Sequence, residues 1–151
     1  MLAELWLSHR NEEQLLQRGA MAAHDPVYGI MRWAYPAAFI AMGIEGALIG
    51  PSPTGFAIVG GVVFIAAKAL KFWAIASLGE RWTYRVFVLP GIPLVTSGPY
   101  RHMRHPNYVG VIGELAGVAA LVGALFTGPL AIAGFGWLLA QRIRAEEKAI
   151  Y

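Results

Sequence analysis

Long apolar stretches separated by short polar segments dominate the pattern of this chain of 151 residues. Four stretches are interpreted as membrane-spanning helices, at residues 30–49, 56–78, 107–126 and 130–140. The first begins with Arg32, Trp33 and Tyr35, which are typical of a membrane interface. The last continues without a break into a polar end that contains Arg142 and Glu146. We therefore expect an all-α integral membrane protein with about four transmembrane helices.

Two segments outside these stretches have a different pattern. Residues 1–23 mix leucines with charged and amide side chains, which predicts an amphipathic helix at the membrane surface that ends near Gly19. The end of a further span is the alternative interpretation. Within residues 79–95, aromatic and β-branched side chains alternate with polar ones, which is typical of a strand. An open strand edge cannot face lipid, so this segment should lie at the interface or fold over a site.

The distribution of basic residues predicts the orientation in the membrane. The two turns expected on the far side, residues 50–55 and 127–129, contain no Lys or Arg, and every other Lys or Arg can reach the near side. The positive-inside rule then places the near side, with both chain ends, in the cytosol. On the third span, Gly110, Gly113 and Gly117 share one face and predict close helix packing.

Composition supports a membrane protein and excludes several other classes. The chain is 57% hydrophobic and 14% charged, whereas about a quarter of the residues of a soluble domain are charged. The sequence pI near 9.5 does not indicate nucleic-acid binding, because the basic residues lie beside the spans. Cysteine is absent and no His, Asp and Glu spacing is typical of a metal site, so we expect no metal. No polar linker divides residues 1–151, which predicts a single domain.

A dense polar cluster at residues 96–110 stands directly before the third span, which begins at Pro106. A three-residue turn is predicted between the third and fourth spans, so these two spans must be antiparallel neighbours. Residues 105–108 should then face residues 142–146 at the same membrane depth. The sequence therefore predicts a cytosolic pocket between the last two spans.

Each polar residue of this region also has a structural interpretation. Arg142 and Glu146 are four positions apart and suit a solvated ion pair on one helix. However, Arg142 follows Pro129 by only about 20 Å of helix, which is short of the roughly 30 Å of a bilayer core, and an ionised group at that depth indicates function. Both interpretations stay open for Arg104, His105 and Tyr108, whereas Arg101 and His102 are better explained by contact with lipid headgroups.

Acidic residues inside the spans raise a separate question. Glu114 lies within the third span, where a carboxylate is costly. It could pair with Lys68 or Lys71, stay protonated, or line a cavity. Glu45 poses the same question near the far surface. The two remaining histidines outside the cluster, His9 and His24, are interpreted as surface residues.

Three motifs together resemble the isoprenylcysteine carboxyl methyltransferase (ICMT) family. They are L-V-T-S-G-P-Y at residues 94–100, R-H-P-N-Y-V-G at residues 104–110, and Arg142 followed by the pair Glu146 and Glu147. The resemblance is strong over roughly the C-terminal third. Residues 9–20 are similar to a bacterial branch of the family that is sometimes found beside polyketide synthases.

The resemblance implies an integral membrane enzyme that transfers a methyl group from S-adenosylmethionine to a lipophilic or prenylated substrate. It implies a multi-pass protein of the bacterial inner membrane with the active site facing the cytosol. Arg142 would meet the acceptor group as the catalytic residue, and Arg85 is a further candidate contact for the cofactor. By position, eight residues would bind the cofactor: Leu94, Val95, Tyr100, His105, Pro106, Asn107, Tyr108 and Glu146.

Three functions are compatible with this resemblance. The first is O-methylation of an isoprenylcysteine-type carboxylate, which is already ionised, so Arg142 need only orient it. The second is O-methylation of a polyketide alkylpyrone or alkylresorcinol, which the bacterial-type N-terminal stretch favours; a phenol or enol must lose a proton, with His105 or Glu114 as candidate base. The third is a non-catalytic membrane scaffold, because relatives extend further at both ends than this chain does.

Overall fold

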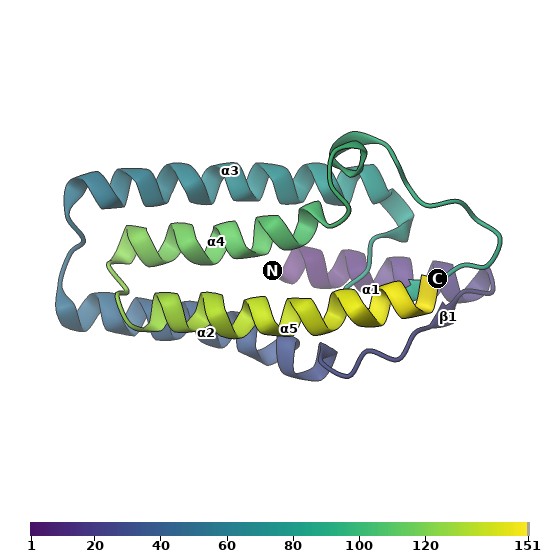
Figure 1. The fold of residues 1–151 in the computed structure, drawn as a ribbon, viewed down its shortest axis with the longest axis horizontal. Helices are drawn as coiled ribbons and strands as arrows, with labels where there is room; N and C mark the ends of the chain where they lie inside the picture. Colours follow the sequence, from purple (N-terminus) through teal and green to yellow (C-terminus); the bar gives the residue numbers. More distant parts are fainter. Residues whose placement is uncertain (151) are drawn as a thin grey trace.

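Four long helices run side by side along the long axis of the computed structural model, which describes residues 1–150 (Figure 1). In chain order these helices are α2 (Tyr28–Ile49), α3 (Thr54–Leu78), α4 (Pro106–Val122) and α5 (Thr127–Ile150). They correspond to the four predicted spans. A fifth helix, α1 (Leu2–Gln17), lies beside the end of α3. The prediction of an all-α fold is therefore confirmed.

The connection between α4 and α5 differs from the prediction. Helix α4 ends four residues earlier than expected, because Gly123 adopts a left-handed conformation with a φ of 75°. Helix α5 then begins at Thr127, so the turn expected at 127–129 is wrong. The carboxylate of Glu45 accepts hydrogen bonds from the backbone N–H groups of Phe126 (2.8 Å) and Thr127 (2.7 Å). This cap from α2 satisfies the start of α5 and explains the position of Glu45.

Helices α3 and α4 pack backbone to backbone through glycines. A Cβ atom added to Gly117 would lie 2.7 Å from the backbone nitrogen of Phe64 and 2.8 Å from the carbonyl oxygen of Gly60. No side chain fits that space. The predicted packing role of the glycines on α4 is therefore confirmed.

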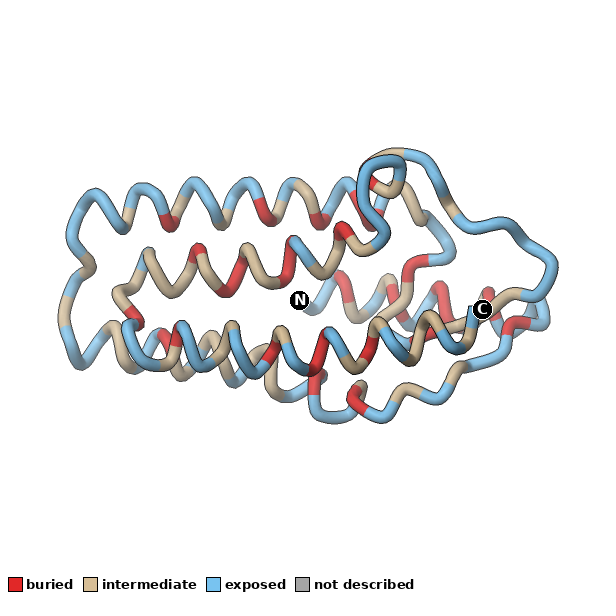
Figure 2. Tube along the Cα trace, viewed as in Figure 1, coloured by how far each residue is buried: buried red, intermediate tan, exposed pale blue. Residues whose placement is uncertain are grey.

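Buried residues face the spaces between the helices, and the outward surface of the bundle is largely exposed (Figure 2). Large apolar side chains on that outward surface include Leu48, Phe56, Ile65, Leu125 and Leu130. Such an extended apolar surface is suited to lipid rather than water. Within residues 1–150, one helical stretch, Thr54–Arg81, meets both the length and the composition expected of a membrane span, and α4 is a shorter apolar helix.

The N-terminal helix α1 turns one of its polar stripes inward. Its buried residues are Glu4, Ser8, Asn11, Glu12 and Leu15, whereas Leu2, Trp6 and Leu16 are exposed. The prediction was an amphipathic helix at the membrane surface, and His9, Arg10 and Glu13 are indeed exposed; the buried polar stripe was not predicted. The helix ends where predicted, since Gly19 follows it with a φ of 82°. The exposed apolar side chains suit contact with lipid.

The strand-like segment after α3 forms little regular sheet. A short 3₁₀ helix, η1 (Gly79–Arg81), comes first, and only β2 (Phe87–Val88) is a strand, paired antiparallel with β1 (Met21–Ala22). The intervening backbone is held by α1 instead: Asn11 donates to the carbonyl oxygen of Trp82 (2.7 Å), and the N–H of Tyr84 donates to Ser8 (2.9 Å). The segment folds over the bundle, as one of the two expectations had it, but mostly not as a strand.

Candidate functional site

Two chambers occupy the end of the bundle where the chain's polar segments gather. The loop chamber encloses about 1300 Å³ of empty space, part of it open to solvent. It lies between residues 78–87, the loop 94–105, the start of α4 and the end of α5. Seven of the eight predicted cofactor residues line it: Leu94, Val95, Tyr100, His105, Asn107, Tyr108 and Glu146. The eighth, Pro106, is fully buried at the first turn of α4.

The helix chamber is smaller, about 760 Å³, and mostly apolar. Side chains from α1, α2, α4 and α5 line it, among them Leu5, Met31, Val111, Phe135 and Leu139. The two chambers share a wall. Four residues line both of them: Thr83, Asn107, Tyr108 and Arg142.

Arg142 lies at this shared wall in a buried polar network. Only 6% of the residue is exposed. Its Nη2 donates to the carbonyl oxygen of Tyr84, and its Nε lies 3.4 Å from Glu146 Oε1 and 3.6 Å from Asp25 Oδ2. The guanidinium carbon is 5.8 Å from the centre of the Tyr108 ring, within range of a cation–π contact. Arg142 and Glu146 therefore form the predicted ion pair, but the pair is buried rather than solvated.

Glu146 brings the start of α4 and the end of α5 together. The hydroxyl of Tyr108 donates to Oε1 of Glu146, and Nδ1 of His105 lies 3.5 Å from Oε2. The rings of His105 and Tyr108 are stacked, with centroids 5.4 Å apart and planes 11° apart. The predicted juxtaposition of residues 105–108 with residues 142–146 is thus present in the structure.

Two polar atoms of this region are buried without a hydrogen-bond partner. They are Nε2 of His105 and Oδ1 of Asn107, and both residues line the loop chamber. Helix α4 also begins without a side-chain cap. Buried polar groups normally find partners, and a helix start favours an anion. A ligand with an ammonium and a carboxylate group fits these unmet acceptors and donors.

The loop that closes the chamber is seated on α3 through a glycine. Gly98 has a φ of 59°, and a Cβ atom there would overlap the hydroxyl oxygen of Ser77 and lie 3.2 Å from Nε1 of Trp73. The short helix η2 (Gly98–Arg101) therefore depends on this glycine to approach α3. It positions Tyr100, whose pKa is raised to about 12 by burial and by the nearby charge of Glu146. Tyr100 is therefore a neutral hydroxyl that can donate a hydrogen bond.

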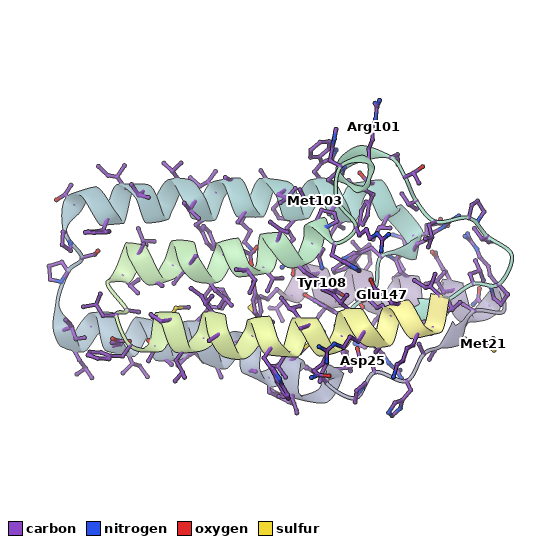
Figure 3. The ribbon with its side chains drawn as sticks, in the orientation of Figure 1. Met21, Asp25, Arg101, Met103, Tyr108 and Glu147 are labelled. Atoms are coloured by element: carbon purple, nitrogen blue, oxygen red, sulfur yellow. The ribbon has the colours of Figure 1, made fainter. Side chains whose placement is uncertain are left out.

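The other basic residues of the cluster point elsewhere. Arg101 extends away from the bundle in Figure 3 and is exposed, as is His102. Neither lines a chamber, which agrees with the headgroup interpretation. Arg104 is also exposed but borders the loop chamber, 3.8 Å from Glu147. Arg85 lines the loop chamber, and His9 and His24 are exposed as predicted.

A second buried polar cluster joins α1, α3 and α4. Nζ of Lys68 is 3.1 Å from Glu114 Oε1, and Nζ of Lys71 is 3.7 Å from Glu114 and 3.0 Å from Glu4. The hydroxyl of Tyr84 donates to Glu4 (2.7 Å), and burial together with this hydrogen bond raises the pKa of Tyr84. Of the interpretations open for Glu114, pairing with the lysines is the one observed; Glu114 lines neither chamber.

Sequence reasoning missed the contributions of Asp25, Glu4, Ser8 and Asn11. The last three share one face of α1 at positions 4, 8 and 11, and that polar stripe was the signal that could have indicated a buried contact. Asp25 carries no such pattern. Among residues 1–150, no group of three or more His, Cys, Asp and Glu side chains is placed to hold a metal ion.

Comparisons with known proteins agree with the motifs. The chain is 32% identical over 148 residues to the uncharacterized protein YpbQ of Bacillus subtilis (strain 168), covering 98% of this chain and 88% of that protein. It is 30% identical over 147 residues to an uncharacterized protein of Haemophilus influenzae (strain ATCC 51907 / DSM 11121 / KW20 / Rd), covering 97% and 86%.

A relative with a named activity is more distant. The chain is 28% identical over 151 residues to the protein-S-isoprenylcysteine O-methyltransferase of Dictyostelium discoideum, covering 95% of this chain and 60% of that protein. No solved structure matches. The profile of the isoprenylcysteine carboxyl methyltransferase family matches residues 58–151, more than half of the chain. This membrane protein therefore belongs to the isoprenylcysteine carboxyl methyltransferase (ICMT) family.

Proposed function

We propose that this protein is an S-adenosylmethionine-dependent O-methyltransferase that acts on a lipophilic acceptor, with an isoprenylcysteine-type carboxylate as the first candidate. The observation that carries the proposal is the shared wall of the two chambers. The loop chamber has the more polar lining of the two, and the helix chamber is mostly apolar and bordered by helices. A methyl donor that is soluble in water and an acceptor that is soluble in lipid could therefore reach opposite faces of Arg142, Asn107 and Tyr108.

The loop chamber is the proposed cofactor site. When bound there, S-adenosylmethionine would supply an electrophilic methyl group on a sulfonium. Oδ1 of Asn107 and the carboxylate of Glu146 would accept hydrogen bonds from its ammonium group, while Nε2 of His105 is a further unmet hydrogen-bonding group beside them. Leu94, Val95, Tyr100 and Tyr108 would enclose the rest, with Pro106 holding the first turn of α4 in place.

The helix chamber is the proposed acceptor site. Its apolar lining suits a lipid tail, and Arg142 is the cation at the wall toward the cofactor. A carboxylate needs only to be held in position there, and a planar guanidinium orients it better than an ammonium would. Correct orientation of two reactants is worth several kcal/mol of a reaction barrier.

An alkylpyrone or alkylresorcinol is the second candidate acceptor. Its hydroxyl must lose a proton, so a base must lie at the chamber wall. Of the two bases suggested by the sequence, His105 lines the loop chamber and Glu114 lines neither. His105 does not line the helix chamber, but its ring stacks on Tyr108 of the shared wall, so this alternative would have to use His105 from the cofactor side.

The proposed membrane arrangement is four spans, α2 to α5, with both chain ends and the loop chamber on the cytosolic side. The connections at the opposite end, residues 50–53 and 123–126, contain no Lys or Arg. Arg81, Arg101 and Arg104 lie at the loop-chamber end. The positive-inside rule supports this orientation, in the inner membrane of a bacterium.

Calorimetric titration of the purified protein in nanodiscs with S-adenosylmethionine tests the proposal. We expect saturable binding that is weakened by Glu146→Gln. Absence of binding by folded protein would reject the enzyme and favour a membrane scaffold that retains the fold. Methyl transfer to a prenylcysteine and to an alkylpyrone, assayed side by side, would then distinguish the two acceptor classes.

A further inference from the structure

A buried carboxylate that belongs to neither chamber contacts the proposed catalytic arginine. The side chain of Asp25 is 5% exposed, and its Oδ2 lies 3.6 Å from Nε of Arg142. Oδ2 has no hydrogen-bond partner among residues 1–150. Asp25 lines neither the loop chamber nor the helix chamber. Its carboxylate can therefore act on a substrate only through Arg142.

The local sequence holds Asp25 in place. Pro26 follows it, which favours an extended backbone at Asp25. The other carboxylate oxygen, Oδ1, accepts hydrogen bonds of 3.1 Å from the backbone N–H groups of Val27 and Tyr28, at the start of α2. Short polar side chains commonly bond to N–H groups two and three positions ahead. One oxygen of Asp25 is thus fixed by α2, and the other is left facing the guanidinium.

Asp25 and Tyr108 lie on opposite sides of α5 in the view of Figure 3. The Arg142 guanidinium contacts both, since its carbon is 5.8 Å from the Tyr108 ring centre. Glu146 is the second carboxylate near Nε, at 3.4 Å, but it lines the loop chamber and accepts a hydrogen bond from Tyr108. A ligand in that chamber would compete for Glu146, whereas it could not reach Asp25.

We propose that Asp25 is a positioning residue that fixes the orientation of Arg142 at the wall between the two chambers, so that the remaining face of the guanidinium is presented to the acceptor. This inference rests on the proposed methyltransferase function. Without the charge of Asp25, Glu146 would be the remaining carboxylate beside Nε of Arg142, and the carbonyl oxygen of Tyr84 would still bind Nη2. The ion pair with Asp25, on the α2 side, keeps Arg142 at the wall when Glu146 binds the cofactor.

The charge of Asp25 and its role at the start of α2 can be separated by substitution. Asp25→Asn keeps an oxygen for the N–H groups of Val27 and Tyr28 and removes only the charge. Asp25→Ala removes both. Glu80→Gln is the matched control, because it neutralises an exposed carboxylate paired with Arg18. Melting temperature and S-adenosylmethionine binding should be measured for each variant beside steady-state kinetics with the acceptor.

If Asp25 positions Arg142, Asp25→Asn should lower kcat/KM for the acceptor about 100-fold, while the affinity for S-adenosylmethionine and the melting temperature stay close to wild type. In an Arg142→Lys background, which has no Nε, the same substitution should have little further effect. Asp25→Asn with wild-type kinetics beside an impaired Asp25→Ala would show a helix-start role only and overturn the inference. Wild-type protein that neither binds S-adenosylmethionine nor transfers methyl would instead reject the function on which the inference rests.

Discussion

Replacing Arg142 with lysine perturbs the proposed chemistry most selectively. The lysine keeps one positive charge between the carboxylates of Asp25 and Glu146, whereas alanine would leave both uncompensated at a cost of about 3–5 kcal/mol in folding stability. That cost is a large part of the roughly 5–15 kcal/mol that stabilises a typical domain. Lysine loses Nε, the donor placed between the two carboxylates, and the planar fork that would orient a carboxylate acceptor.

The expected effect follows from these contacts. A misplaced orienting group costs about 100-fold in rate, which corresponds to about 2.7 kcal/mol of transition-state stabilisation. Arg142→Lys should therefore lower kcat for methyl transfer about 100-fold, and S-adenosylmethionine affinity should change by less than about threefold, because the unmet polar atoms of His105 and Asn107 are untouched. Arg142→Ala should abolish turnover in whatever fraction folds.

The assay is transfer of a labelled methyl group to a lipophilic acceptor by protein in nanodiscs, with cofactor binding measured separately by calorimetry. Arg144→Lys is the matched control: Arg144 is on the same helix, exposed, and lines neither chamber. Wild-type turnover by Arg142→Lys would refute the role assigned to Arg142.

Three further predictions concern the cofactor site and the bundle. Glu146→Gln should weaken S-adenosylmethionine binding at least tenfold in calorimetry, because a hydrogen bond to a charged group is worth about 1.5–3 kcal/mol; an unchanged Kd would contradict the role of Glu146. Gly117→Leu should destabilise the bundle by at least about 1–3 kcal/mol in a thermal unfolding assay, because the added Cβ would lie 2.7 Å from the backbone nitrogen of Phe64. Gly134 has open space around it, so the control Gly134→Leu should unfold like wild type. The phenolate absorbance that is lost in Tyr100→Phe should titrate near pH 12 rather than pH 10, because burial favours the neutral hydroxyl. The stability that the neutral hydroxyl contributes is complete below pH 10 and is lost as the pH rises toward 12. Titration at pH 10 would show that Tyr100 is not buried as described.

Much of the helical framework could be predicted from sequence, because each span is a local apolar run. The juxtaposition of His105 and Tyr108 with Arg142 and Glu146 also followed from local information, since a short connection makes consecutive helices antiparallel neighbours. The exact position of the connection between α4 and α5 did not follow from local information. Pro129 suggested a turn, but Glu45, 82 positions before Thr127 in the sequence, caps the start of α5.

Other features depend on partners far away in the sequence. The amphipathic pattern of α1 did not indicate which polar residues are buried: Glu4 contacts Lys71, and Ser8 and Asn11 bind the backbone around Tyr84. Because Ser8 and Asn11 bind backbone groups of residues 79–95, this alternating segment forms almost no strand. Asp25 could not be assigned from the sequence at all, because nothing near it in the chain indicates the buried guanidinium that it faces.

The central claim is that a methyl group passes between the two chambers at the wall formed by Arg142, Asn107 and Tyr108. The most direct measurement reconstitutes wild-type protein in liposomes with S-adenosylmethionine labelled in its methyl group and either a prenylcysteine or an alkylpyrone. We predict that label accumulates in one extractable methylated acceptor with the wild type and is lost with Arg142→Lys. Folded wild-type protein that binds S-adenosylmethionine but transfers label to neither acceptor would contradict the account.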